Sequence, residues 1–74
     1  MSRLIRLDHT GHTTLAEWSV DDTSAVAGAV AAFNTELGHG YFAVASTGDG
    51  VAEQVRELPV DASLVILRRP IAGG

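Results

Sequence analysis

The sequence predicts an α+β fold, in which one small mixed β-sheet packs on a single helix, and three observations predict it. The chain has 74 residues, of which 46% are hydrophobic, so it fits one domain with an economical core. Segments with strand-like alternation lie towards both ends, and one segment with helical periodicity lies between them. The chain contains no cysteine, so neither disulfides nor a thiolate zinc site can substitute for the core.

The first two strands are predicted to form a hairpin over residues 2–8 and 13–20. The turn between them contains Gly11, which can adopt a positive φ because it has no Cβ. Alternation along the second strand places Trp18 on the core face and Leu15 on the opposite, exposed face. The other core-face positions of this strand are Thr14, Ala16 and Val20.

A helix is predicted to begin at residues 21–24, where two aspartates, a threonine and a serine are all good N-cap residues. It is expected to end at the Gly-His-Gly of residues 38–40. Helical spacing leaves Asn34 and Glu36 on the outer face. Gly28 costs about 1 kcal/mol relative to alanine in a helix, which we attribute to close packing of the helix on the sheet. The residues of the apolar face are Val26, Ala29, Val30, Phe33 and Leu37.

Three more strands are predicted in the second half of the chain. Residues 41–46 form a short apolar segment, and a tight turn at residues 47–50 leads into a weaker alternation over residues 51–58. That weaker pattern is typical of an edge strand. Residues 63–67 are the most continuous apolar run, so we expect a central strand that is buried on both faces.

The composition changes abruptly after this last strand, to Arg68, Arg69, Pro70, Ile71, Ala72, Gly73 and Gly74. Proline cannot donate to a β-ladder and glycine resists ordering, so the sheet should end near Arg69. The sequence therefore predicts a folded domain over residues 1–69 and a flexible tail over residues 70–74.

Charge and hydropathy argue against several classes of partner. The net charge is −4 and all five cations are arginines, which disfavours nucleic-acid binding. A membrane span needs about 20 consecutive apolar residues, and every apolar stretch of this sequence is much shorter. The N-terminus lacks the apolar region of a signal peptide. We therefore expect a soluble cytoplasmic protein with no nucleic-acid or membrane partner. The histidines have no standard metal-ligand spacing and are interpreted as solvated turn residues. They are His9, His12 and His39.

Three stretches carry a resemblance to a known family: His-Thr-Gly-His-Thr at 9–13, Asp-Asp-Thr at 21–23, and the last strand with its two arginines at 62–69. With the Gly73-Gly74 ending, this layout resembles the β-grasp fold of ubiquitin, of ubiquitin-like modifiers, and of the sulfur carriers of molybdopterin and thiamine synthesis. The final residues 70–74 are most similar to the molybdopterin-synthase small subunit.

The resemblance implies that the carboxylate of Gly74 is the reacting group. An adenylating enzyme would use ATP to activate it, and the chain would contribute no catalytic residue, metal or bound cofactor of its own. Two glycines without Cβ let an extended backbone enter a narrow channel. The residues that such an enzyme would recognise are Arg68, Arg69, Pro70, Ile71, Ala72 and Gly73. Further implied partners are a conjugating enzyme, a protease that cleaves after Gly-Gly, and a target protein.

Three functions remain open from the sequence. The first is a bacterial ubiquitin-like modifier, because arginine without lysine amid much alanine, valine and glycine suggests a GC-rich coding bias. The second is a sulfur carrier that ends in a thiocarboxylate. The third is a non-covalent interaction subunit, which would associate through an edge strand. Arg68 stands where ubiquitin has an exposed apolar valine, so eukaryotic ubiquitin receptors are not expected to bind.

Overall fold

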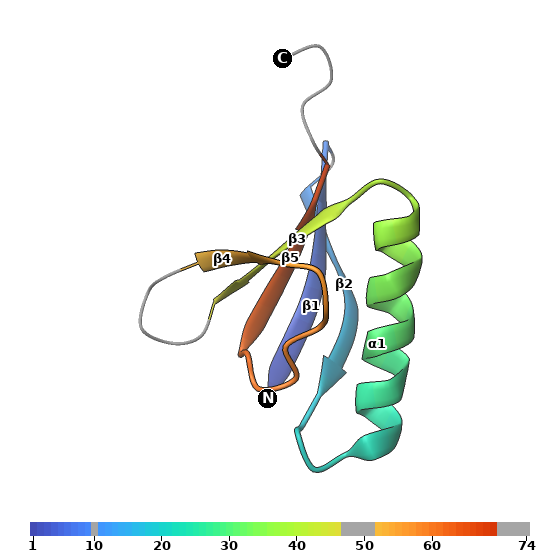
Figure 1. Cartoon of the computed structure of the whole chain (residues 1–74), viewed down its shortest axis with the longest axis vertical. Helices are drawn as coiled ribbons and strands as arrows, with labels where there is room; N and C mark the ends of the chain where they lie inside the picture. The colour runs from blue at the N-terminus through green and yellow to red at the C-terminus, as the bar shows by residue number, and fades with distance from the viewer. Residues whose placement is uncertain (10, 47–51, 70–74) are drawn as a thin grey trace.

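The computed structural model describes residues 1–9, 11–46 and 52–69. These residues form an α+β domain in which one helix lies against one face of a five-stranded sheet (Figure 1). The elements in chain order are β1 (Ser2–Asp8), β2 (Gly11–Trp18), α1 (Thr23–Gly38), β3 (Phe42–Ser46), β4 (Ala52–Val55) and β5 (Leu64–Arg68). The predicted order of strands and helix is confirmed. In the described part of the chain, no helix has the length and apolar character needed to cross a membrane.

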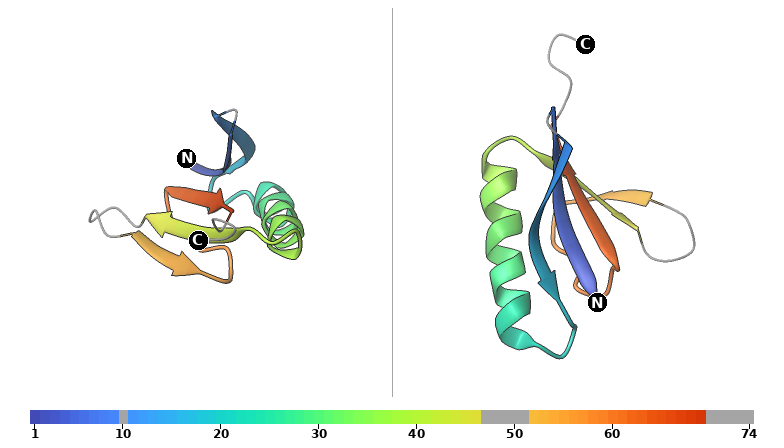
Figure 2. Two further views of the ribbon diagram at one scale, coloured as in Figure 1. Left: turned by 90° about the horizontal axis from the view of Figure 1, so that it is seen from above. Right: turned by 180° about the vertical axis from the view of Figure 1, so that it is seen from behind.

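The strands lie in the order β2-β1-β5-β3-β4. The first and last strands in the sequence, β1 and β5, are parallel neighbours, and the other pairs are antiparallel. The predictions that β5 is central and that β4 is an edge are confirmed. The prediction that β5 is buried on both faces is wrong. Val65 and Leu67 are buried but Leu64 and Ile66 only half-buried, because α1 covers one face of the sheet (Figure 2).

Both ends of α1 are fixed by local hydrogen bonds. Asp22 is the N-cap, and its Oδ1 accepts a bond of 3.1 Å from the backbone N–H of Ala25. At the other end Gly40 has a φ of 94°, and the backbone N–H of Tyr41 donates to the carbonyl of Glu36 over 3.2 Å. This left-handed glycine with a bond back to the last turn is a Schellman motif. It turns the chain from α1 directly into β3.

The core lies between α1 and the sheet, and its largest member is Trp18, which is 1% exposed. The predicted core position of this residue is confirmed. The indole Nε1–H donates to the carbonyl of Val60 over 2.9 Å, which fixes the segment between β4 and β5 against the end of the core. Four of the core residues are alanines. The full core is Leu4, Trp18, Ala29, Phe33, Ala43, Ala45, Ala62, Val65 and Leu67.

A β-bulge changes the faces that were predicted for β2. The register between β1 and β2 shifts between Leu4 and Ile5, because β2 contains one additional residue, Leu15. Leu15 therefore packs against the core instead of being exposed, and Thr14 pairs with Ile5 on the face away from α1. Val20 lies beyond the end of β2 and is 57% exposed, so its predicted core position is also wrong.

Two predictions about α1 are wrong as well. Gly28 is exposed, and a Cβ added to it would meet no atom within 4 Å, so close packing on the sheet does not explain this glycine. Glu36, predicted to lie on the outer face, is buried at 8% exposure. Its ion-pair partner is Arg6 on β1, which belongs to the candidate site.

Candidate functional site

The candidate site lies where β5 ends. Arg68 is the last residue of β5 and Arg69 follows it, so the sheet ends where the sequence predicted. Both arginines are exposed. The other predicted site residues lie outside the described residues, as does the predicted turn at 47–50. These site residues are Pro70, Ile71, Ala72, Gly73 and Gly74.

The two arginines differ in the surface that each one faces. Arg68 pairs in register with Phe42 of β3, whose side chain lies on the sheet face away from α1. Successive residues of an extended chain point to opposite faces, so Arg69 lies on the helix side, next to Tyr41. A shallow groove lies at this end of the sheet, between the C-terminal ends of β5 and β1. Its lining residues are Leu7, Asp8, His9, Arg68 and Arg69.

Tyr41, which immediately precedes β3, has two guanidinium groups near its ring. The Cζ of Arg69 lies 5.4 Å from the ring centroid, and the Cζ of Arg6 lies 6.0 Å from it. Both distances fall within the range of cation–π attraction. The half-buried ring thus connects the last residue of the folded domain to β1.

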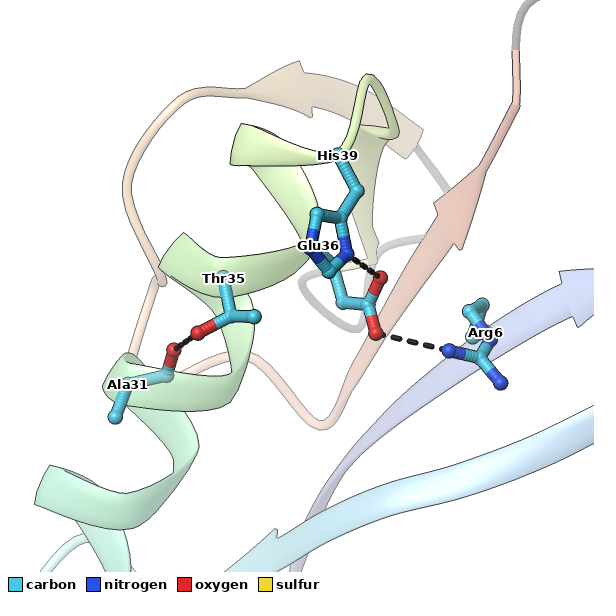
Figure 3. A network of polar contacts seen from close by, with 5 residues as sticks. All are labelled: Arg6, Ala31, Thr35, Glu36 and His39. Atoms are coloured by element: carbon cyan, nitrogen blue, oxygen red, sulfur yellow. Dashed lines mark hydrogen bonds and ion pairs between the residues drawn. The ribbon is translucent and has the colours of Figure 1, made fainter.

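Arg6 is in turn held by Glu36, whose carboxylate is buried between α1 and β1 (Figure 3). The Nη1 of Arg6 donates to Oε1 of Glu36 over 2.9 Å, and the two side chains are 30% and 11% exposed. The Nδ1 of His39 lies 3.6 Å from Oε2 of the same carboxylate. Arg6 Nε and Glu36 Oε2 are buried without a hydrogen-bond partner among the described residues. The ion pair with Arg6 offsets the cost of burying the carboxylate of Glu36.

Glu36 is therefore the centre of the arrangement, through both its side chain and its backbone. Its carbonyl accepts hydrogen bonds from the backbone N–H groups of His39 and Tyr41, over 3.0 and 3.2 Å. Its carboxylate binds Arg6, which lies at the Tyr41 ring. One residue of α1 thus fixes both the backbone and the surroundings of the ring that Arg69 contacts. We call Arg6, Glu36, Tyr41 and Arg69 the strand-end cluster.

Sequence reasoning identified Arg69 but missed the other three members of this cluster. One signal was present in the sequence. Arg6 alternates in phase with Leu4, which places an arginine on the same face of β1 as a core residue. A cation at a core position requires an anionic partner, but which acid supplies it depends on how α1 lies across β1.

The opposite face of the sheet is a second surface that the sequence reasoning missed. No helix or strand of the described segments covers it (Figure 2). Its apolar residues are half-buried and alternate with the core residues of the same strands, and Ile66 at its centre pairs with both Ile5 and Val44. We call this surface the open sheet face. It contains Ile5, Leu7, Phe42, Val44, Leu64 and Ile66.

The fold and site together define a small α+β domain whose central strand ends at Arg68 and is followed by Arg69, which faces the other side of the sheet. No known protein family, no curated protein and no solved structure matches the chain. Within the described segments, no group of three histidine, cysteine or acidic side chains is placed to hold a metal ion.

Proposed function

We propose that this chain is a bacterial ubiquitin-like protein modifier with a β-grasp fold, and that an adenylating enzyme activates the Gly74 carboxylate for conjugation to a target protein. The observation that carries the proposal is the course of β5. This strand lies at the centre of the sheet, parallel to β1, and ends at Arg68, and the sequence after it continues as Arg-Pro-Ile-Ala-Gly-Gly.

The proposed chemistry places every catalytic group on partner enzymes. An oxygen of the Gly74 carboxylate attacks the α-phosphorus of ATP, forming an acyl-adenylate and releasing pyrophosphate. A cysteine thiolate of an enzyme then attacks the acyl carbon, AMP leaves, and a thioester forms. Finally an amine of the target displaces the thiolate to give an amide. The described domain provides a surface for recognition and a fixed point from which the terminal glycines reach the partner's active site.

Adenylation is tested with the purified chain, the adenylating enzyme encoded in the same genome, ATP and labelled pyrophosphate. We expect exchange of label into ATP with the wild-type chain and none with a chain extended by one residue after Gly74. The extended chain is the matched control, because it retains the whole domain. Equal exchange with both chains would refute activation at Gly74.

Conjugation is tested by mass spectrometry of proteins that carry the tagged chain in its source cells. Trypsin cleaves after Arg68 but not between Arg69 and Pro70, so a conjugated lysine should retain residues 69–74 as a diagnostic remnant. Finding this remnant on target lysines would support the modifier function. Its absence, together with a product in which sulfur has replaced one terminal oxygen, would identify the sulfur carrier instead.

A non-covalent interaction subunit is the other candidate, and two observations favour it. β2 is an outer strand of eight residues, and on its outer side it has no strand neighbour among the described residues, so its backbone groups there can pair with another chain. The open sheet face adds an apolar surface to that edge. Under this function, Gly74→Ala and the extended chain should both retain activity in cells. Loss of activity in either variant would exclude it.

A further inference from the structure

We infer that the two adjacent arginines have different roles: Arg69 is a positioning residue that stacks on Tyr41 and fixes where the terminal segment leaves the domain, whereas Arg68 remains free for the partner enzyme. The inference rests on the proposed function, because the terminal segment matters only if its carboxylate reacts. It goes beyond that function because it identifies the contact that orients the chain at Arg69.

The first step is the separation of the two guanidinium groups. Arg69 Cζ lies 5.4 Å from the centroid of the Tyr41 ring, on the helix side of the sheet. Arg68 lies on the other side, opposite Phe42, and its guanidinium makes no ion pair or hydrogen bond with any residue in the described segments. An enzyme that approaches the open sheet face would therefore meet Arg68 with all of its donors available.

The second step is that Tyr41 is held independently of Arg69. Its backbone N–H donates to the Glu36 carbonyl, and the left-handed Gly40 before it fixes the direction of the chain. Arg6 lies at the ring and is bound by the buried carboxylate of Glu36 over 2.9 Å. The ring is thus anchored to α1 and β1, so the contact restricts Arg69 more than it restricts Tyr41.

The third step concerns the backbone of Arg69. The sequence places Pro70 next, and a residue before proline is confined to extended conformations. Stacking restricts the side chain of Arg69 while the following proline restricts its backbone. The last described residue of the chain therefore has few conformations, which lowers the entropy cost of inserting the following residues into an enzyme channel.

The stacking itself is tested by NMR, without any enzyme. Protons above a ring face resonate upfield, so the δ-methylene protons of Arg69 should be shifted upfield in the wild type and in Tyr41→Phe. They should return to ordinary values in Tyr41→Leu, and Arg68→Gln should leave them unchanged. Identical Arg69 shifts in the wild type and Tyr41→Leu would overturn the inference. Thermal unfolding of each variant confirms that it is folded at the temperature used.

The positioning role is tested by steady-state adenylation with the same variants as substrates. Loss of an exposed cation–π contact should raise KM about twofold to fivefold in Tyr41→Leu and Arg69→Gln. The value of kcat should be unchanged, because neither side chain takes part in the proposed chemistry of the carboxylate. Tyr41→Phe should behave as the wild type. The double variant Tyr41→Leu/Arg69→Gln should have the same KM as either single variant, because both substitutions remove the same contact.

These outcomes separate the inference from the proposed function. An unchanged KM for Tyr41→Leu, with the upfield shift of Arg69 abolished, would overturn the positioning role while adenylation of the wild type stands. A wild-type chain that shows the upfield shift but is not adenylated would overturn the proposed function, and the positioning role with it, while the stacking of Arg69 stands. A rise in kcat/KM on loss of the ring would show that the stack opposes activation, which also contradicts the inference.

Discussion

The ion pair between Arg6 and Glu36 should be the strongest single polar contribution to the stability of this domain. The perturbation is Glu36→Leu, which leaves the guanidinium of Arg6 without its counter-ion on the core face of β1. Breaking a fully buried pair in this way costs about 3–5 kcal/mol, whereas an exposed pair contributes about 0–1 kcal/mol. Glu36 is 11% exposed but Arg6 is 30% exposed, so water can partly hydrate the remaining cation. We therefore expect a loss of about 2 kcal/mol.

The double variant distinguishes pairing from simple loss of side chains. Arg6→Leu/Glu36→Leu removes both charges and replaces them with apolar groups between α1 and β1, so it should cost less than the two single changes together. A coupling free energy of about 1–3 kcal/mol is expected between residues in one ion pair. Glu36→Gln is the conservative control, because it retains an acceptor for Arg6 without the charge. Its destabilisation should lie between those of the wild type and Glu36→Leu.

Urea unfolding followed by tryptophan fluorescence measures these free energies directly, because Trp18 is the only tryptophan and is 1% exposed. For a domain of this size, a loss of 2 kcal/mol corresponds to a fall of about 8–16 °C in Tm. The comparison requires equal m values in the wild type, Glu36→Leu, Arg6→Leu, the double variant and Glu36→Gln. Additive effects of the two leucine substitutions, with coupling below about 0.5 kcal/mol, would refute the view that Arg6 is what makes the burial of Glu36 tolerable.

Four more outcomes are expected. Gly28→Ala should raise the free energy of unfolding by about 0.5–1 kcal/mol, since the position is helical and open; Gly40→Ala, at a φ of 94°, should lower it by about 1–2 kcal/mol, and both are measured by urea unfolding. Asp22→Ala should cost about 1 kcal/mol through loss of the N-cap bond, while the neighbouring Asp21→Ala should change Tm little. Under the proposed function, polymers of this chain should be linked only through the N-terminal amine, because the chain contains no lysine; peptide mapping that found an isopeptide bond to an internal residue of another copy would contradict this.

The parts of the fold that the sequence predicted correctly are those that local chemistry decides. Asp22 caps the helix because its carboxylate reaches an N–H three residues later. Gly11 and Gly40 have positive φ where the chain turns, and Trp18 lies in the core. In each case the evidence lay within a few residues, so strand alternation, capping and turn chemistry predicted the order of the elements.

The errors occur where a distant segment decides the outcome. The spacing of the apolar residues assigned Glu36 to the outer face, but Glu36 is in phase with the buried Ala29 and Phe33, and Arg6 on β1 pairs with it there. The face of Leu15 depends on a bulge that arises in pairing with β1. The exposure of one face of β5 could have been predicted, because a single helix covers one face of a sheet and leaves the other open. Arg69 was predicted as a site residue, but its partner Tyr41 follows only from strand register.

That register is set by the core, and so the core determines how the two arginines are presented. In the pairing of β3 with β5, Ala43 lies opposite Leu67 and Ala45 lies opposite Val65, so a small residue always faces a large one beneath α1. A slip of one residue would turn every side chain of β3 to the other face. Phe42 and Val44 would then replace the two alanines in the core, which overpacking disfavours. Since the same slip would also move Tyr41 away from Arg69, the pairing of small with large core residues also keeps the strand-end cluster together.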